Sequence, residues 1–331
     1  MIGPDGVVKY QSPAMTRVFG HDPATYVPHA VHAGGHTYHE TNCYTDIIIE
    51  LVHARGDESL AVLGSTVRSD FEGDQWTFFK PWPSDVEALF GIDIHEMQPY
   101  RPLPLQIAEL LPLDRTLIVE LDSWYLPDTA STSYRTEHVK SSVVAESIDV
   151  SGEVLRYFHN TSLYELAGED YRGVFRIGGS FSGDVLPPYT ELVRFDAGPR
   201  LEGQELRTAA RGLLRYHLDR RPAGNPFQRF GERLVADLPR LLDGDSAAYH
   251  AYAFATVRMA GAGFELCASH VDWLLGSDGQ RASAALGQIV EGSKVLGFKL
   301  ARRRPFDIEA VVQPLGDAWD DAMSSLDRAL R

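Results

Sequence analysis

Cys43, one of two cysteines in the chain, is the residue with the clearest chemical potential. A polar run ends at Asn42, and apolar residues then recur every three to four positions, which predicts a helix over 42–55 with one buried face. Thr41 or Asn42 can cap its start. Cys43 then lies in the first turn, where unpaired backbone N–H groups and the positive end of the helix dipole favour a thiolate. We therefore expect Cys43 to act as a nucleophile.

A cysteine nucleophile needs an imidazole to take its proton and a third side chain to orient that ring. His138 precedes a predicted strand at 139–148, and Asn160 follows the hairpin partner predicted at 154–158. A helix-borne cysteine, a strand-borne histidine and then an Asn or Asp is the order found in papain-type enzymes. We predict that Cys43, His138 and Asn160 are the catalytic residues.

The third catalytic residue has an alternative. Asp122 ends a predicted strand at 116–121 that can lie beside the strand of His138. Asn160 needs a bulge or a longer turn, because a tight hairpin turn places Tyr164 opposite His138. Asn160 is the first choice and Asp122 the second.

Further polar and aromatic side chains are expected to support the chemistry or line a cleft. They are Asn42, Asp122, Gln75, Trp76, Trp124 and His36. Backbone N–H groups near Cys43 would stabilise an oxyanion. A polar turn with one buried aromatic side chain accounts equally well for Gln75 and Trp76. Cys267 lies within a predicted helix, where we expect it to pack in the core.

His32, His36, His39 and Cys43 are spaced four, three and four residues apart, which is close to ligand spacing on a helix. Two glycines at 34–35 would interrupt such a helix, and zinc would quench the thiol as a nucleophile. We therefore expect no metal site.

Length and composition place the chain among globular proteins. It has 331 residues, enough for two domains, with 44% hydrophobic, 23% charged and 10% aromatic residues. No apolar run reaches the ~20 residues of a membrane span, and the first residues lack the basic start and apolar core of a secretory signal. Two cysteines are too few for a disulfide framework. These features predict a cytoplasmic protein.

The net charge of −15, from 31 basic and 46 acidic residues, argues against nucleic acid or an anionic membrane as a partner. Basic residues do gather at 207–221 and 294–304. They form either a local basic face or an ordinary solvated helix surface.

The order of predicted elements indicates an α+β domain followed by an all-helical one. Residues 1–197 contain the strands, the Cys43 helix and an extended N-terminal arm over 1–30, and residues 198–331 form the helical domain. The C-terminal helices are predicted at 203–219, 227–241, 246–259, 264–275, 280–298 and 315–330.

Four stretches carry a resemblance to a known family: ETNCY at 40–44, DFEGDQWTFFK at 70–80, DSWYLPDT at 122–129 and YFHN at 157–160. Through them the chain resembles, nearly from end to end, the bacterial domain-of-unknown-function family 1839. Its N-terminal half is more distantly similar to papain-like, butirosin-type acyltransferases that depend on a carrier protein. This resemblance implies a papain-like domain with a central antiparallel sheet and a nucleophile helix.

The same resemblance implies a cysteine acyltransferase. Cys43 would accept an aminoacyl or acyl group from a phosphopantetheine thioester and pass it to an amine or another small-molecule acceptor. The phosphopantetheine belongs to the partner, an acidic carrier protein, so no cofactor of the chain's own is expected. The basic clusters at 207–221 and 294–304 would dock that carrier.

Two other functions remain open. A thiol hydrolase (an amidase, protease or thioesterase) would use the same residues with water as acceptor, and a non-catalytic adaptor would only bind the carrier protein. The chain also departs from the papain pattern, because no glutamine lies just upstream of Cys43. The second oxyanion donor is therefore open between Asn42, His36 and a backbone amide.

Overall fold

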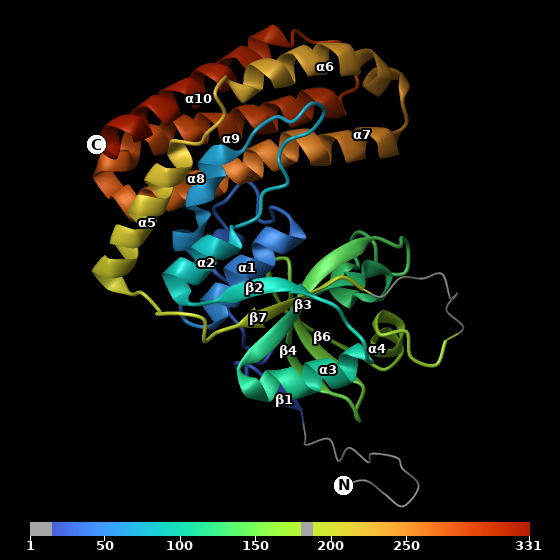
Figure 1. Cartoon of the computed structure of the whole chain (residues 1–331). Helices are drawn as coiled ribbons and strands as arrows, with labels where there is room; N and C mark the ends of the chain where they lie inside the picture. Colours follow the sequence, from blue (N-terminus) through green and yellow to red (C-terminus); the bar gives the residue numbers. More distant parts are fainter. Residues whose placement is uncertain (1–14, 180–187) are drawn as a thin grey trace, which may run out of the picture. The chain divides into compact units, whose positions relative to one another are not determined.

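The computed structural model of the chain describes residues 15–179 and 188–331 (Figure 1). Residues 1–14 of the predicted N-terminal arm lie outside the described residues. The described part combines an antiparallel sheet with helices, and its C-terminal region is helical. The predicted α+β class is therefore confirmed.

The chain divides into two compact units, each made of two separate stretches. The sheet unit comprises residues 1–28 and 91–198, and the helical unit comprises residues 29–90 and 199–331. The sequence instead grouped residues 29–90 with the strands, so the Cys43 helix was expected in the same domain as the sheet. In the structure this helix belongs to the helical unit.

Residues 29–90 join the C-terminal helices because they share a hydrophobic core with them. Phe71 and Trp76 are buried against aromatic side chains of the C-terminal region, with ring centroids 5.4 Å apart for Phe71–Phe230 and 4.7 Å apart for Trp76–Phe227. Local apolar spacing shows that a segment is buried but not which distant segment buries it. The grouping therefore could not be derived from the local pattern.

The described strands of the sheet unit form one seven-stranded antiparallel sheet in the order β2-β7-β3-β4-β5-β6, with β1 paired to β4. The strands are β1 (Thr16–Arg17), β2 (Asp93–Met97), β3 (Arg115–Asp122), β4 (Lys140–Asp149), β5 (Val154–His159), β6 (Ser162–Ala167) and β7 (Thr190–Arg194). The central strands β3 and β4 are buried along most of their length. In β3 this burial explains the apolar run from Leu117 to Val119.

A β-bulge in β4 secures the segment that precedes the sheet. The register of β4 with β5 shifts between Ala145 and Ser147, which leaves Glu146 as the extra residue. Its buried carboxylate accepts backbone hydrogen bonds from Gly20, at 2.5 Å, and His21, at 3.0 Å. Glu146, the bulged residue of β4, thus fixes the segment around Gly20 and His21 to the sheet.

Helices and short turns complete the sheet unit. They are α3 (Leu103–Leu110), α4 (Glu169–Val174) and the 3₁₀ turns η3 (Leu111–Leu113), η4 (Ser123–Tyr125) and η5 (Pro127–Thr129). Helix α3 lies along the sheet, where Leu103 and Ile107 share a core with β3 and β4 (Figure 1). The turns η4 and η5 follow β3 directly and carry the DSWYLPDT motif.

The helical unit contains the Cys43 helix and the C-terminal helices. Its elements are η1 (Ala30–His32), α1 (Cys43–Ala54), η2 (Ser59–Arg68), α2 (Pro83–Phe90), α5 (Gly203–Leu218), α6 (Pro226–Asp243), α7 (Ser246–Ala253), the π-helical η6 (Phe254–Arg258), α8 (Met259–Leu275), η7 (Gly276–Gly279), α9 (Gln280–Ala301) and α10 (Glu309–Ala329). Helix α9 packs between α8 and α10, and α10 also packs on α6 (Figure 1).

The predicted helices agree with those observed, apart from their ends. The helices predicted at 246–259 and 264–275 are joined through the π-helical turn η6. The segment 59–68, whose type the sequence did not determine, is a 3₁₀ helix. None of the helices in the described residues is long and apolar enough to cross a membrane.

Candidate functional site

Cys43 is the first residue of α1, as predicted, and Asn42 is the N-cap. The Asn42 side chain accepts a hydrogen bond from the Thr45 backbone N–H at 3.0 Å and donates to the Thr45 hydroxyl at 3.1 Å and the Phe79 carbonyl at 2.9 Å. With its amide engaged in this way, Asn42 holds the helix start in place, and its role as an oxyanion donor stays a prediction. Cys43 itself is half-buried and is a free thiol.

The other cysteine has a different environment. Cys267 lies fully buried within α8, as expected, and burial raises the pKa of its thiol to about 12, although a hydrogen bond with Thr66 partly opposes the shift. Such a thiol stays protonated at neutral pH. Of the two cysteines, Cys43 is the accessible one.

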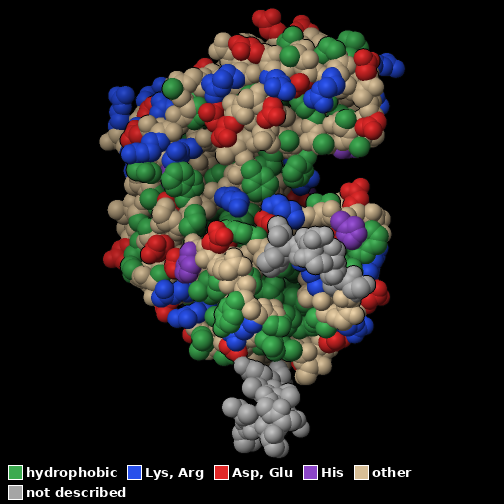
Figure 2. Space-filling view, turned by 45° about the vertical axis from the view of Figure 1, so that its right-hand side comes forward, with side chains coloured by type: hydrophobic (Ala, Val, Ile, Leu, Met, Phe, Trp, Pro, Cys, Tyr) green, Lys and Arg blue, Asp and Glu red, His purple; other side chains and the backbone are tan. Residues whose placement is uncertain are grey.

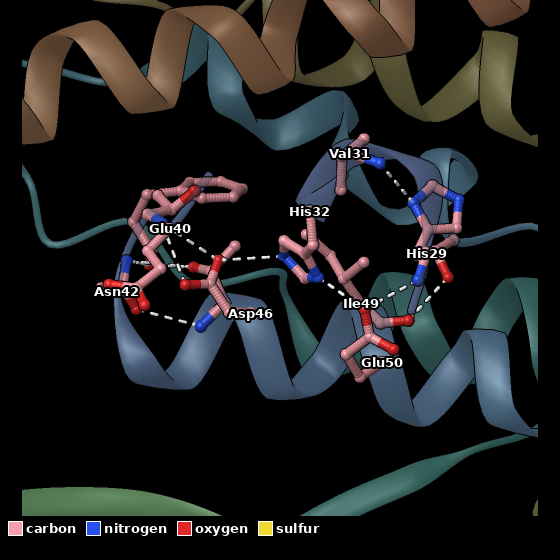
Figure 3. A network of polar contacts seen from close by, with 12 residues as sticks. His29, Val31, His32, Glu40, Asn42, Asp46, Ile49 and Glu50 are labelled. Carbon is pink, nitrogen blue, oxygen red and sulfur yellow. Dashed lines mark hydrogen bonds and ion pairs between the residues drawn. The ribbon is translucent and has the colours of Figure 1, made fainter. Parts of the chain in front are cut away.

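The face of α1 that carries Cys43 also carries two buried carboxylates. Cys43, Asp46 and Glu50 are three and four residues apart, so they lie on one face of the helix. Both acids are fully buried. They face His32, whose Nδ1 is 2.5 Å from Glu50 and whose Nε2 is 3.5 Å from Asp46 (Figure 3).

Burial by itself lowers the pKa of His32, but hydrogen bonds with Asp46 and Glu50 more than offset it and raise the pKa to about 9. His32 is therefore an imidazolium at neutral pH. Burial raises the pKa of Asp46, which the cation opposes. The one buried cation compensates part of the charge of the two buried acids, which would otherwise have no counter-charge in the core.

Backbone groups complete this network and tie the segment before α1 to the helix. Asp46 accepts from the Thr41 N–H at 2.9 Å, and Glu50 accepts from the His29 N–H at 3.0 Å (Figure 3). The chain from 29 to 42 is thereby held at both ends against α1.

His36 and His39, which were considered as metal ligands from the sequence, contact different partners. His36 Nδ1 lies 3.6 Å from Glu265, a carboxylate that also accepts two backbone N–H groups, and His39 is 3.2 Å from the Ala33 carbonyl. In the described ranges, no three or more His, Cys, Asp or Glu side chains are grouped so that they could hold a metal ion. His36, which was also considered as an oxyanion donor, lies beside Glu265, and the donor role stays a prediction.

In the sheet unit, His138 pairs with Asp122, the second choice for the orienting residue. Its Nδ1 is 2.7 Å from an Asp122 oxygen, and the other oxygen of that carboxylate accepts from the Trp124 N–H at 3.1 Å. The Trp124 ring stacks on the imidazole with centroids 4.5 Å apart. The ring is thus oriented by a carboxylate and an aromatic face, which leaves Nε2 as the nitrogen able to accept a proton.

Asn160, the first choice, lies in the turn between β5 and β6 with a left-handed φ of 46°. Its neighbour His159 is the residue that enters a network. His159 Nδ1 is 2.5 Å from Asp128 and its Nε2 is 2.6 Å from the Ser141 hydroxyl, while Tyr157 donates to Asp128. Asp122 is therefore the residue hydrogen-bonded to His138, because β3 pairs with β4 and ends beside it. The catalytic role of either Asn160 or Asp122 stays a prediction.

The Asp128–His159–Ser141 network was missed at the sequence level. The signal was available, since Asp128 belongs to the DSWYLPDT stretch and both Tyr157 and His159 belong to the YFHN stretch. His159 is 1% exposed and the Asp128 side chain 3% exposed. A buried imidazole with both nitrogens engaged fixes η5 to the sheet.

The comparison with known families covers nearly the whole chain. Residues 27–195 match the DUF1839 N-terminal domain, and residues 203–328 match the DUF1839 C-terminal domain. The chain belongs to the DUF1839 family. No curated protein matches it.

The matches to the two DUF1839 domains end at 195 and begin again at 203, and the boundary drawn from the sequence at 197 falls in this interval. The compact units follow a different division, because residues 29–90 of the N-terminal domain pack with the C-terminal helices. The Cys43 helix of this DUF1839 protein therefore lies in one unit, and the His138–Asp122 pair lies in the other.

Two side chains expected near a cleft of the DUF1839 protein have other environments. Trp76 is 2% exposed and packs against Phe227, Phe230 and Phe264, so it is a core residue. Gln75 is exposed in a turn where its carbonyl accepts from the Glu72 N–H at 2.8 Å. The alternative of a polar turn with one buried aromatic was the correct interpretation.

The basic cluster at 207–221 is largely used within the protein. Arg215 and Arg221 both bind Asp327, at 3.0 and 2.7 Å, and Arg211 donates to the Ala329 carbonyl. These contacts connect α5 to α10. On the face shown in Figure 2, Lys and Arg side chains are interspersed with Asp and Glu side chains. A carrier-docking role for the basic clusters stays a prediction.

Proposed function

We propose that this DUF1839 protein is a cysteine-dependent acyltransferase with a papain-like catalytic part. Cys43 would receive an acyl or aminoacyl group from a carrier-protein thioester and transfer it to an amine or another acceptor. The observation that carries the proposal is the position of Cys43, an accessible thiol at the start of α1. The cap of this helix and the segment before it are held in place by hydrogen bonds. Cys267, by contrast, is sealed in the core.

The helix start supports a nucleophilic role through its electrostatics. The N–H groups of the first turn and the helix dipole stabilise a negative charge on the sulfur. The buried network around His32 holds the segment before Cys43 against α1. A thiol held in this way can attack without first ordering its surroundings.

The sequence predicts His138 as the base, and its pairing with Asp122 is consistent with that role. His138 Nε2 would take the thiol proton, and the sulfur would attack the carbonyl carbon of the incoming thioester. The carrier's thiol would leave with that proton. An amine would then attack the enzyme thioester and release Cys43 as the thiol.

The test is incubation of the protein with acyl-loaded carrier protein, followed by intact mass measurement. An acyl adduct on the wild type, retained in Cys267→Ala and absent in Cys43→Ala, supports the proposal. Adding candidate amines then separates transfer from hydrolysis, since only a transferase forms the amide product. If Cys43→Ala turns over the thioester as fast as the wild type, the proposal is wrong. If the carrier binds without any adduct, the protein is an adaptor.

A further inference from the structure

A cavity of about 570 Å³ lies within the helical unit, between the end of η2 and the chain from 77 to 83. Its volume falls in the range of small-molecule sites. The residues that matter for its chemistry are Ser65, Arg68, Glu72, Phe79, Lys80 and Trp82. Two cations, a hydroxyl and aromatic walls therefore meet in one hollow.

The two cations of this cavity have aromatic neighbours but no acidic partner. The Arg68 guanidinium lies 4.4 Å from the centre of the Trp82 ring, and the Lys80 ammonium lies 3.9 Å from the centre of the Tyr44 ring. Among the residues that the structure describes, no carboxylate oxygen is within 4.0 Å of either cation. An aromatic face orients a cation without neutralising it.

This lack of acidic partners is notable in a chain of net charge −15. Other arginines of the helical unit have carboxylate partners, such as Arg221 with Asp327 and Arg281 with Asp321, both at 2.7 Å. The carboxylate lining the cavity, Glu72, accepts a hydrogen bond from the Thr77 hydroxyl at 2.8 Å. The cavity therefore retains local positive charge.

A buried hydroxyl in the wall of the cavity also lacks a partner. Ser65 is 2% exposed, and its Oγ has no hydrogen-bond partner in the described part of the chain. Buried polar atoms in proteins are nearly always hydrogen-bonded, so an exception needs an explanation. A ligand oxygen in the cavity would provide the missing partner.

We infer that this cavity binds the phosphoryl group of a small organic phosphate, with Arg68 and Lys80 as its cationic contacts and Ser65 as a hydroxyl contact. A phosphoryl group offers several charged oxygens, which suits two cations and a hydroxyl better than a single carboxylate does. The organic part of the ligand would lie on the apolar wall formed by Phe79 and its neighbours. The charge of the whole chain argues against a nucleic acid in the same place.

The cavity is connected to the start of α1 through Phe79. Its backbone carbonyl accepts hydrogen bonds from Asn42, at 2.9 Å, and from the Thr45 hydroxyl, at 2.7 Å. These residues flank Cys43. The phosphoryl group could belong to a phosphopantetheine arm or to a free nucleotide, and the site does not require Cys43 to react. The inference therefore stands apart from the proposed function.

The test uses calorimetric titration of the full-length Cys43→Ala protein, in which the acyl adduct at Cys43 cannot form. The probes are 4′-phosphopantetheine, AMP, and pantetheine, which lacks the phosphate. We expect at least one phosphate compound to bind and pantetheine to bind at least tenfold more weakly. Binding of 4′-phosphopantetheine identifies the arm as the source, and binding of AMP alone identifies a nucleotide.

Three variants in the same background assign the site. Arg68→Gln and Lys80→Gln should each weaken binding of the phosphate compound at least tenfold, whereas Arg331→Gln, at an exposed arginine of the same unit outside the two basic clusters, should leave it unchanged. Lys80 is exposed, so its variant remains informative if Arg68→Gln fails to fold. The inference is overturned if neither phosphate compound binds, if pantetheine binds equally well, or if Lys80→Gln binds as the parent does.

Discussion

Two histidines of this protein each have carboxylate partners, but they differ in burial. His32 in the helical unit is sealed between Asp46 and Glu50, with a side chain only 2% exposed. His138 in the sheet unit has one carboxylate partner, Asp122, and its side chain is 65% exposed. A buried imidazole with two acids fixes the fold, whereas an exposed, oriented imidazole can exchange a proton with a substrate. Residue type and pairing alone do not separate these roles.

The largest expected effect concerns His138 and sharpens this comparison. His138→Ala should reduce the rate of acyl transfer about 10²–10⁴-fold, because a general base in a cysteine enzyme contributes on that scale. Single-turnover transfer from loaded carrier protein measures it. His95→Ala, which removes another exposed imidazole paired with a carboxylate, is the matched control and should keep the full rate. Full activity of His138→Ala would remove His138 from the mechanism.

The next effect is on the stability of the protein and concerns His32. His32→Ala leaves two buried carboxylates without their cation, which should lower the free energy of unfolding by about 3–5 kcal/mol. His138→Ala should change it by less than about 0.5 kcal/mol, since exposed ion pairs contribute little. Urea unfolding of both variants tests the contrast. Equal losses for the two histidines would break the comparison.

The pH dependence of stability gives a third test. The folded pKa of His32, about 9, exceeds the ordinary value of 6.5, so its contribution is fully present below pH 6.5 and is lost as pH rises through 9. The loss should be roughly 3 kcal/mol, from 1.36 kcal/mol for each pKa unit. Urea unfolding between pH 6 and 9.5 measures it. A His32→Gln variant should lack this fall, and an identical fall in that variant would assign it to other groups.

The smallest effect concerns the second buried network, at His159. Burial and the nearby Asp128 raise the pKa of Tyr157 far above its usual range, so its hydroxyl remains a donor. Tyr157→Phe removes that donor and should cost about 1–3 kcal/mol in unfolding free energy. Tyr100→Phe, at a side chain 83% exposed, should cost nothing measurable. Thermal and urea unfolding of the two variants provide the comparison.

The elements were more predictable than their partners. The helix around Cys43 was predicted at 42–55 and spans Cys43–Ala54, because its cap and its apolar spacing are local features. Asp122 could be proposed beside His138 because β3 and β4 are adjacent strands. Local patterns are sufficient for such features.

Partners distant in sequence could not be derived in the same way. His159 enters a buried network, and its neighbour Asn160 does not take its place there, because His159 contacts Asp128, which lies in η5 and is distant in sequence. From the sequence alone, Asp46 and Glu50 of α1 would be read as surface residues. Their burial is understandable only once His32 is known to lie against them. The grouping of residues 29–90 with the C-terminal helices likewise depends on long-range aromatic packing. Each of these features depends on tertiary structure.

The Phe79 carbonyl accepts hydrogen bonds from both Asn42 and Thr45. It therefore couples the wall of the cavity directly to the cap of α1. A molecule that displaces this oxygen would loosen the end of the helix that carries the thiol. Occupancy of the cavity and formation of the cap would then be thermodynamically linked: a ligand that weakens the cap binds more weakly to the capped helix, by the same free energy.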